Sequence, residues 1–287
     1  MSHLLKSVEK YYFCLMKWIK LLWDIYVKGS IHVALSVFSM AALSLISLNK
    51  NIPELPLSIV FFASYVYYNL IKFAPVGFKG TNQPTIFWNW LKLSTLFSLL
   101  ILLYLVKDLS QDSWIILALS LFFGVLYVQK ELLPISRENG WIKAFLVSLV
   151  WALITAVLPF ALLQEAWFGL EVILLFLSHF FLVLALLVPF EIRDMSVDQL
   201  MLPNLAQQLG VQKIKWVGYL SLILSITLWL LATELGIYLQ STYFIFYCIT
   251  AALIAGARID RPQSYTSLWV EAIPIFLLGS VWALSLL

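Results

Sequence analysis

The chain has 287 residues, of which 62% are hydrophobic and only 11% are charged, and its formal net charge is +3. A chain with so little polar surface cannot cover a water-soluble globule, so lipid must be its main solvent. The small positive charge is explained by membrane topology and gives no indication of a nucleic-acid partner.

Residues 1–28 predict a helix that lies along the membrane surface. Their basic and aromatic residues alternate: Lys6, Lys10, Lys17 and Lys20 with Tyr11, Tyr12, Trp18, Trp23 and Tyr26. Lysines at such a surface meet anionic lipid, while aromatic rings lie at the headgroup level. The segment lacks the continuous apolar stretch and small-residue cleavage site of a signal peptide. Residues 29–287 are predicted to form one transmembrane helical domain.

Nine stretches after residue 28 come near the length that crosses a bilayer, whose core of roughly 30 Å needs about 20 helical residues. They fall near 31–48, 56–73, 91–106, 113–130, 141–163, 168–190, 214–235, 240–257 and 268–287. The sequence therefore predicts an all-α polytopic membrane protein of about nine transmembrane helices. Two longer connections, about 73–90 and about 191–213, are predicted to be cytoplasmic cap loops.

The basic residues predict the orientation, because cytoplasmic loops collect Lys and Arg. If the N-terminus is inside, the inner segments hold 16 of the 18 basic residues, and the outer loops hold only Lys50 and Lys107. A missed or invented span would scramble this division. We therefore expect an integral protein of the cell's inner or plasma membrane, with a cytoplasmic N-terminus and the C-terminus on the opposite side.

Three acids in the second cap loop indicate a metal site. Glu191, Asp194 and Asp198 are spaced i, i+3 and i+7, so they share one face of a helix. A divalent cation relieves their repulsion, and Mg²⁺ suits oxygen ligands and often completes its shell with substrate phosphates. Arg193 beside them is placed to pair with a diphosphate. The alternative is that these acids only cap a membrane helix at the water interface.

The stretch Pro189-Phe-Glu-Ile-Arg-Asp-Met-Ser-Val-Asp198, followed by Leu202-Pro203 and Leu209-Gly210, closely resembles the second aspartate-rich motif of the UbiA superfamily of intramembrane prenyltransferases, D-x-R-D-x-x-x-D. The segment Tyr127-Val-Gln-Lys130 is similar to the family's tyrosine–lysine segment, one residue shorter. This resemblance implies a UbiA-like bundle in which Glu191, Asp194 and Asp198 hold Mg²⁺. It also implies that Arg193, Lys130 and Tyr127 bind the diphosphate of an isoprenyl substrate.

The family's first motif, N-D-x-x-D-x-x-x-D, is degenerate at the end of the second span. Asn69 is retained, but Leu70, Phe73 and Gly77 stand where acids are expected, and Lys72 adds a positive charge. The resemblance implies a catalytic or phosphate-contacting role for Asn69. Lys72 is placed to replace one metal ion at the diphosphate, or else it is an ordinary positive-inside anchor.

Two polar residues fall inside predicted spans. His179 lies in the middle of the sixth span, where its ring must find a partner within the bundle, and a structural hydrogen bond is favoured over a place in the substrate cavity. Glu271 lies near the start of the last span. An ion pair with Arg258 or Arg261 is the favoured interpretation of this acid.

Three functions stay open at this point. The resemblance implies a prenyltransferase that uses Mg²⁺ to transfer the isoprenyl group of an isoprenyl diphosphate to an unknown apolar acceptor, or to cyclise it, with the tail of the substrate entering from membrane lipid. The degenerate first motif favours a non-catalytic homologue that binds an isoprenoid or lipid diphosphate or accompanies a biosynthetic enzyme. A secondary transporter is less supported, because no paired Gly/Pro-broken helices occur at corresponding positions.

Overall fold

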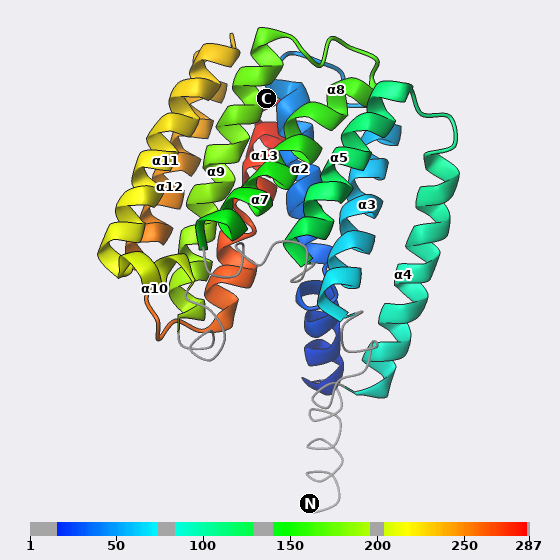
Figure 1. Ribbon diagram of the computed structural model, residues 1–287, viewed down its shortest axis with the longest axis vertical. Coiled ribbons are helices and arrows are strands. Elements are labelled where there is room, and N and C mark those ends of the chain that lie inside the picture. Colours follow the sequence, from blue (N-terminus) through cyan, green and yellow to red (C-terminus); the bar gives the residue numbers. More distant parts are fainter. Residues whose placement is uncertain (1–15, 74–83, 129–139, 196–203, 286–287) are drawn as a thin grey trace, which may run out of the picture.

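The computed structural model describes residues 16–73, 84–128, 140–195 and 204–285, and the regular secondary structure in these ranges is all helical. Lipid offers no hydrogen-bond partners to backbone amides, so helices that satisfy their own backbone are the expected form of these apolar stretches. Figure 1 shows the long helices running side by side along the long axis of the molecule.

The long helices follow the predicted spans. They are α2 (Ile31–Ser47), α3 (Glu54–Phe73), α4 (Thr85–Leu105), α5 (Gln111–Val128), α7 (Gly140–Ala152) continued by α8 (Leu158–Leu162), α9 (Leu170–Asp194), α11 (Val211–Ala232), α12 (Ile237–Gly256) and α13 (Ile273–Ser285). The largest difference is at α4, which begins directly after Pro84 and not at residue 91. Its first turns carry Trp88, Asn89 and Trp90, so they are helical without being continuously apolar.

Eight helical segments in the described ranges are long and apolar enough to cross a membrane. A ninth span is α2, which has 17 residues and is bent by 44° from the preceding helix Met16–Val27. The predicted all-α fold of about nine spans is therefore confirmed. Of the predicted surface helix, residues 1–15 lie outside the described residues, and its place at the membrane surface stays a prediction.

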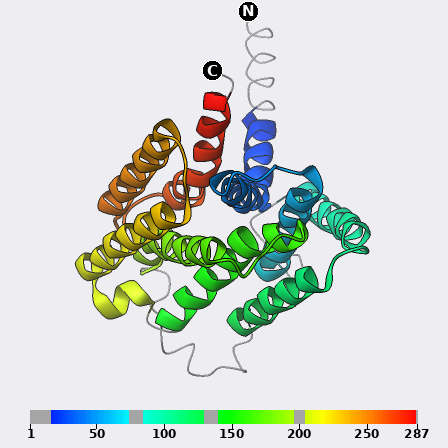
Figure 2. The same ribbon diagram turned by 90° about the horizontal axis from the view of Figure 1, so that it is seen from above.

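The bundle closes on itself, because the last span returns beside the first. Seen from above in Figure 2, α13 lies next to α2, and these two helices pack together. In the centre, α9 packs along α11 and α7. Hydroxyl groups join these elements: Ser178 on α9 donates to the Ser225 carbonyl on α11 (2.9 Å), and the Ser225 and Tyr247 hydroxyls are 2.7 Å apart.

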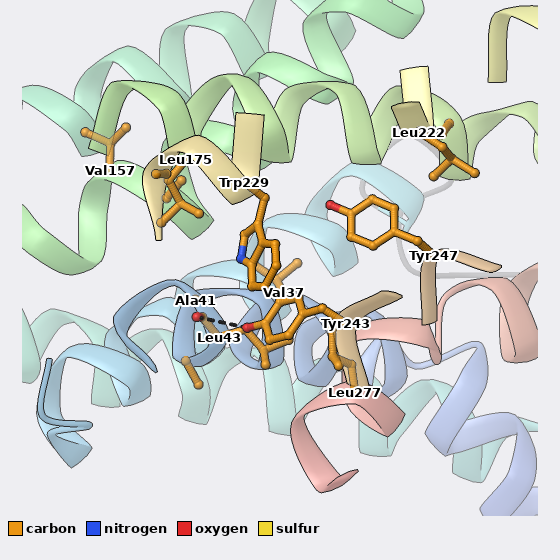
Figure 3. Close-up of a cluster of buried hydrophobic side chains, with 14 of the residues drawn as sticks. Val37, Ala41, Leu43, Val157, Leu175, Leu222, Trp229, Tyr243, Tyr247 and Leu277 are labelled. Atoms are coloured by element: carbon orange, nitrogen blue, oxygen red, sulfur yellow. Dashed lines mark hydrogen bonds between the residues drawn. The ribbon is translucent and has the colours of Figure 1, made fainter. Parts of the chain in front are cut away.

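Aromatic side chains fill the core away from the cap loops. Figure 3 shows Trp229 stacked on Tyr243 with ring centroids 4.2 Å apart, and the Tyr243 hydroxyl donating to the Leu43 carbonyl at 3.3 Å. The Trp229 indole N–H donates to the Ser47 hydroxyl at 3.1 Å. Each ring thus buries a large apolar area while its polar atom is satisfied, which ties α2 to α11 and α12.

A π-helical turn, η2 (Leu153–Val157), joins α7 to α8. Pro159 has no N–H for the carbonyl of Thr155 four residues earlier, and the Ser44 hydroxyl donates to that carbonyl at 2.6 Å. The Thr155 hydroxyl lies 2.8 Å from Nδ1 of the buried His179 ring. The predicted structural hydrogen bond of His179 is therefore confirmed.

Candidate functional site

A cavity of about 280 Å³ with charged residues in its wall lies at the end of the bundle where α9 finishes, and we call it the head cavity. Its walls come from α2, α3, α5, α7, α9 and the start of the last span. The charged residues that line it are Lys72, Lys143, Glu191, Asp194 and Glu271, and Tyr67, Tyr68, Tyr127 and Trp151 line it as well. Lys50 pairs with Glu165 (2.9 Å) in the connections at the opposite ends of α2 and α9, so the two ends differ in character.

Asp194 is the last residue of α9 and faces the head cavity while Arg193 holds its carboxylate. Nε of Arg193 donates to Oδ1 of Asp194 at 2.6 Å, and Nη2 donates to Oδ2 at 3.1 Å. The remaining Nη1 donates to the Thr266 hydroxyl, and the guanidinium lies 5.2 Å from the centre of the Phe190 ring. Arg193 therefore fixes the orientation of Asp194 and does not itself line the cavity.

Thr266 belongs to a second π-helical turn, η4 (Tyr265–Val270), which opens the last span. The Glu271 N–H donates to the Thr266 carbonyl five residues earlier, at 3.2 Å. This wider turn brings Val270 and Glu271 to the cavity wall, close to the helix end that carries Asp194. Such turns occur often at functional sites.

Glu191 is 5% exposed, and its two oxygens have separate partners. Oε2 accepts the Leu205 N–H at 2.8 Å, and Oε1 lies 3.6 Å from Nζ of Lys143 on α7. The Glu191 carbonyl also accepts the Asn204 amide at 2.9 Å. The carboxylate thus fastens the start of α10 (Leu205–Leu209) to the end of α9, which is a structural use of an acid predicted to bind metal.

The short helix α10 lies between Pro203 and Gly210. It begins with a capping box, in which the Asn204 side chain accepts the Gln207 N–H and Gln207 Oε1 accepts the Asn204 N–H, both at 2.8 Å. It ends at Gly210, whose φ of 81° suits a glycine. A Cβ at Gly140 would lie 2.5 Å from the Leu205 nitrogen, so the start of α7 touches this cap directly.

Lys72 and Glu271 both line the head cavity. The Lys72 ammonium lies 5.8 Å from the centre of the Tyr68 ring and has no ion pair within 4 Å among the residues that the structure describes. Glu271 likewise has none, and the two charges attract each other across the cavity. Arg258 instead pairs with Asp260 (3.5 Å), and Arg261 donates to the Gly256 carbonyl (3.1 Å). The predicted ion pair of Glu271 with these arginines is therefore wrong.

Asn69 lies away from the head cavity. Its side chain is fully buried against α4, where Nδ2 donates to the Thr95 hydroxyl at 3.1 Å, and its Oδ1 has no hydrogen-bond partner among the described residues. Tyr127, at the end of α5, lines the cavity as the resemblance implied. Lys130 and Asp198 lie outside the described residues.

Leu70 and Phe73 of the degenerate first motif do not line the head cavity, and Gly77 lies outside the described residues. Leu70 is 45% exposed and lines an apolar space, and the Phe73 ring packs against Phe87 and Trp88 at 6.4 and 5.4 Å between centroids. Lys72, between these residues on α3, is the one that reaches the cavity. The charge that α3 presents to the site is thus positive where the family presents acids.

An apolar chamber of about 340 Å³ adjoins the head cavity. It lies deeper in the bundle, between α3, α4, α5 and α7, and its lining is almost entirely aliphatic and aromatic. Four residues line both spaces: Tyr67, Tyr68, Val150 and Trp151. The site therefore combines a charged end with an apolar extension toward the middle of the bundle, which is the shape that suits an amphipathic lipid.

Sequence reasoning missed Lys143 and Glu271 as members of this site, and it missed the pairing of Tyr68 with Trp151. The Trp151 indole N–H donates to the Tyr68 hydroxyl at 2.5 Å. The sequence does offer a signal for Lys143, because this residue stands at the inner end of the fifth predicted span. Charge patterning alone uses it only to predict the membrane topology. The aromatic pair had none, because the two residues are 83 positions apart.

The donor set at the cavity suits one Mg²⁺ better than two. Asp194 offers carboxylate oxygens at the cavity and Glu271 faces Lys72, whereas Glu191 is engaged with Leu205 and Lys143, and α3 contributes no acid to the wall. Within the described ranges there is no group of three or more His, Cys, Asp or Glu side chains that could hold a metal ion. Mg²⁺ in proteins is often bound by only one or two carboxylates together with substrate phosphates.

Comparisons with known proteins bear on the fold. No protein-family model and no curated protein sequence matches the chain. A solved structure of a digeranylgeranylglyceryl phosphate synthase, a membrane prenyltransferase of the UbiA superfamily, aligns with a TM-score of 0.55 and 18% sequence identity, over 93% of this chain and 96% of that one. This likeness extends over nearly the whole bundle, so the chain has the fold of a UbiA-type intramembrane prenyltransferase.

Proposed function

We propose that this protein is a membrane prenyltransferase that binds an isoprenyl diphosphate in the head cavity and transfers or cyclises its isoprenyl group. The observation that carries the proposal is the meeting of Lys72, Lys143 and Asp194 around one cavity, at the end of a bundle with a prenyltransferase fold. Two ammonium groups that can contact phosphate oxygens, and an Asp194 carboxylate that can hold Mg²⁺, suit a diphosphate head beside an apolar space for its hydrocarbon tail.

In this proposal Lys72 and Lys143 bind phosphate oxygens, and Lys72 takes the position at which the family presents its first acidic motif. Asp194 and Asp198 would hold a single Mg²⁺, and the ion would supply positive charge that neutralises the diphosphate. Tyr68 and Trp151 line both the head cavity and the apolar chamber, where an aromatic ring would stabilise a developing allylic cation. The apolar walls exclude the water that would otherwise quench that cation.

The first test is pyrophosphate release from geranylgeranyl diphosphate by the purified protein in lipid nanodiscs, with and without Mg²⁺. We expect Mg²⁺-dependent release that falls by roughly tenfold to a hundredfold in both Lys72→Ala and Asp194→Asn, because a hydrogen bond to a charged group contributes roughly 1.5–3 kcal/mol. Lys215→Ala is the matched control, since the Lys215 ammonium donates to the Ala255 carbonyl at 2.7 Å and does not line the cavity.

The second candidate function is a non-catalytic homologue that binds the same diphosphate or accompanies a biosynthetic enzyme. The structural observation that favours it is the outward-facing, apolar replacement of the first acidic motif by Leu70 and Phe73. Diphosphate binding that needs Lys72, without pyrophosphate release at any Mg²⁺ concentration, would select this function. If both variants still bind diphosphate and release pyrophosphate as the wild type does, both functions are refuted for this cavity.

A further inference from the structure

The side chains of Ser36 on α2 and Glu271 at the start of the last span meet in one part of the head cavity wall. The His32 Nε2–H donates to the Leu268 carbonyl at 3.0 Å, so these two residues lie side by side. From this end of the bundle α2 and α13 run in the same direction, packed against each other (Figure 1). Ser36 comes about one turn after His32, and Glu271 about one turn after Leu268. The two side chains therefore lie at the same level, and we call them the Ser36–Glu271 corner.

The polar atoms of this corner have unused hydrogen-bonding capacity. Ser36 is 1% exposed, and its hydroxyl has no hydrogen-bond partner among the described residues. The Glu271 carboxylate makes no hydrogen bond in those ranges either, although it is attracted by the charges of Lys72 and Arg193. Buried polar groups in folded proteins almost always have partners. A ligand that supplies the missing partners is therefore indicated at the corner.

Among the described acids of the cavity wall, Glu271 is the one whose oxygens are not already engaged by hydrogen bonds. Asp194 accepts two hydrogen bonds from the arginine beside it. Glu191 accepts a backbone N–H from the start of α10 and lies 3.6 Å from the Lys143 ammonium. Transfer of an isoprenyl group to a hydroxyl acceptor releases a proton, and a base in contact with the acceptor speeds that step. Glu271 is the acid that is free to be this base.

The surroundings of the corner favour an acceptor without charge. Val33 and Val270, both buried, lie next to it in the cavity wall. A carboxylate or phosphate on the acceptor would meet Glu271 as a like charge beside these apolar side chains. In the proposed function the two lysines of the cavity are occupied by the diphosphate. A hydroxyl group, by contrast, donates its proton to the carboxylate and accepts a hydrogen bond from Ser36.

We infer that Glu271 and Ser36 bind the acceptor of the reaction, that this acceptor is an uncharged alcohol or phenol, and that Glu271 is the base that takes its proton. The bond between C1 of the isoprenyl group and the diphosphate oxygen breaks, and its electron pair leaves on the diphosphate. The acceptor oxygen forms the new bond to C1, while its proton passes to Glu271 and, after the products leave, to water. The inference rests on the proposed function, since it needs the isoprenyl diphosphate in the head cavity.

The experiment gives the wild type in lipid nanodiscs geranylgeranyl diphosphate, Mg²⁺ and 4-methylphenol, and measures both pyrophosphate and the geranylgeranyl ether. Glu271→Gln keeps the size of the side chain and removes the base. We expect it to lower ether formation by at least roughly a hundredfold and pyrophosphate release by no more than about threefold, because the base acts in proton removal and not in ionisation. Geranylgeranyl alcohols formed with water then replace the ether.

A matched pair of acceptors tests the preference for an uncharged compound. 4-Hydroxybenzoate has the ring and hydroxyl of 4-methylphenol, with a carboxylate in place of the methyl group. We expect its ether to form at least roughly tenfold more slowly, because like charges brought together in a binding site cost several kcal/mol.

A pair of serine variants tests the hydroxyl of the corner. We expect Ser36→Ala to raise the KM for 4-methylphenol by about threefold to tenfold, the effect of one lost hydrogen bond, and to leave pyrophosphate release unchanged. Ser148→Ala is the matched control and is expected to leave this KM unchanged. Ser148 is also buried, and its hydroxyl also has no partner in the described ranges, but it does not line the head cavity.

Equal losses of ether and pyrophosphate in Glu271→Gln would overturn the inference, because Glu271 would then be only a counter-charge for Lys72. Pyrophosphate release without ether in the wild type would overturn it as well, and so would equal use of the two acceptors or the same KM in the two serine variants. Absence of pyrophosphate release from the wild type would instead overturn the proposed function, and the inference with it.

Discussion

Glu191 has two alternative roles, as a structural contact and as a metal ligand, and two substitutions distinguish between them. Its carboxylate accepts the Leu205 N–H and pairs with Lys143, so Glu191→Gln keeps the first contact and loses the second. We expect Glu191→Gln to leave the Mg²⁺ dependence of pyrophosphate release unchanged and Glu191→Ala to lower the thermal unfolding temperature, because it leaves a buried N–H unsatisfied at a cost of about 1–3 kcal/mol. If Glu191→Gln needs a higher Mg²⁺ concentration for pyrophosphate release, Glu191 is a metal ligand.

The same residue marks the limit of prediction from sequence. The spacing of Glu191 and Asp194 correctly places both at one helix end that faces the cavity. Periodicity describes only the residue's own helix, however, and the partners that decide its role come from α7 and from the far side of a loop. Glu271 was misjudged for the same reason, since its sequence neighbours Arg258 and Arg261 are engaged elsewhere while Lys72 faces it from α3.

At the scale of elements, the cap formed by α10 depends on the absence of a side chain at Gly140. A Cβ there would lie 2.5 Å from the nitrogen and 2.9 Å from the Cα of Leu205, and backbone atoms cannot move aside as a flexible side chain can. We expect Gly140→Ala to destabilise the protein by about 1–3 kcal/mol and to weaken diphosphate binding. Thermal unfolding in detergent measures the first effect.

Gly279→Ala is the control for this substitution, because nothing lies within 4 Å of a Cβ at Gly279 in the middle of α13. There the alanine is expected to be neutral or slightly stabilising, since alanine is the better helix former. Equal effects of the two substitutions would mean that the contact between α7 and the cap carries no stability.

The spans were predictable because apolar stretches of sufficient length leave the chain little alternative in lipid. The two π-helical turns were not, because they depend on partners from other helices. The turn before Pro159 relies on Ser44 of α2, and the turn at Tyr265–Val270 is met by Arg193 of α9. The start of α4 was missed because its first residues are helical without being apolar.

For the whole molecule, the division of basic residues predicts which end faces the cytoplasm, and the head cavity lies at the end predicted to be inside. After replacement of Cys14 and Cys248 by serine, single cysteines at Lys107 and Arg258 test this with a membrane-impermeant maleimide on intact cells. We expect labelling of Lys107→Cys alone and labelling of Arg258→Cys only after the membrane is opened. The reverse pattern would invert the topology and place the site outside.

The charges gathered at the head cavity have a further consequence for how ligands combine there. Among the described residues, three cations and three carboxylates meet at the cavity or beside it: Lys72, Lys143, Arg193, Glu191, Asp194 and Glu271. The described part of the site is therefore close to neutral before anything binds. A diphosphate alone brings an excess of negative charge, and Mg²⁺ alone brings an excess of positive charge, so each is disfavoured without the other.

The two ligands should consequently bind cooperatively, and thermodynamic linkage requires the effect to be mutual. We expect saturating Mg²⁺ to raise the affinity for geranylgeranyl diphosphate by roughly 5–150-fold, and the diphosphate to raise the affinity for Mg²⁺ by the same factor. Titration calorimetry of each ligand in the presence and absence of the other measures both factors. A diphosphate affinity independent of Mg²⁺ would mean that the lysines alone neutralise the diphosphate. With the expected cooperativity, the head cavity is occupied only when diphosphate and Mg²⁺ are both present.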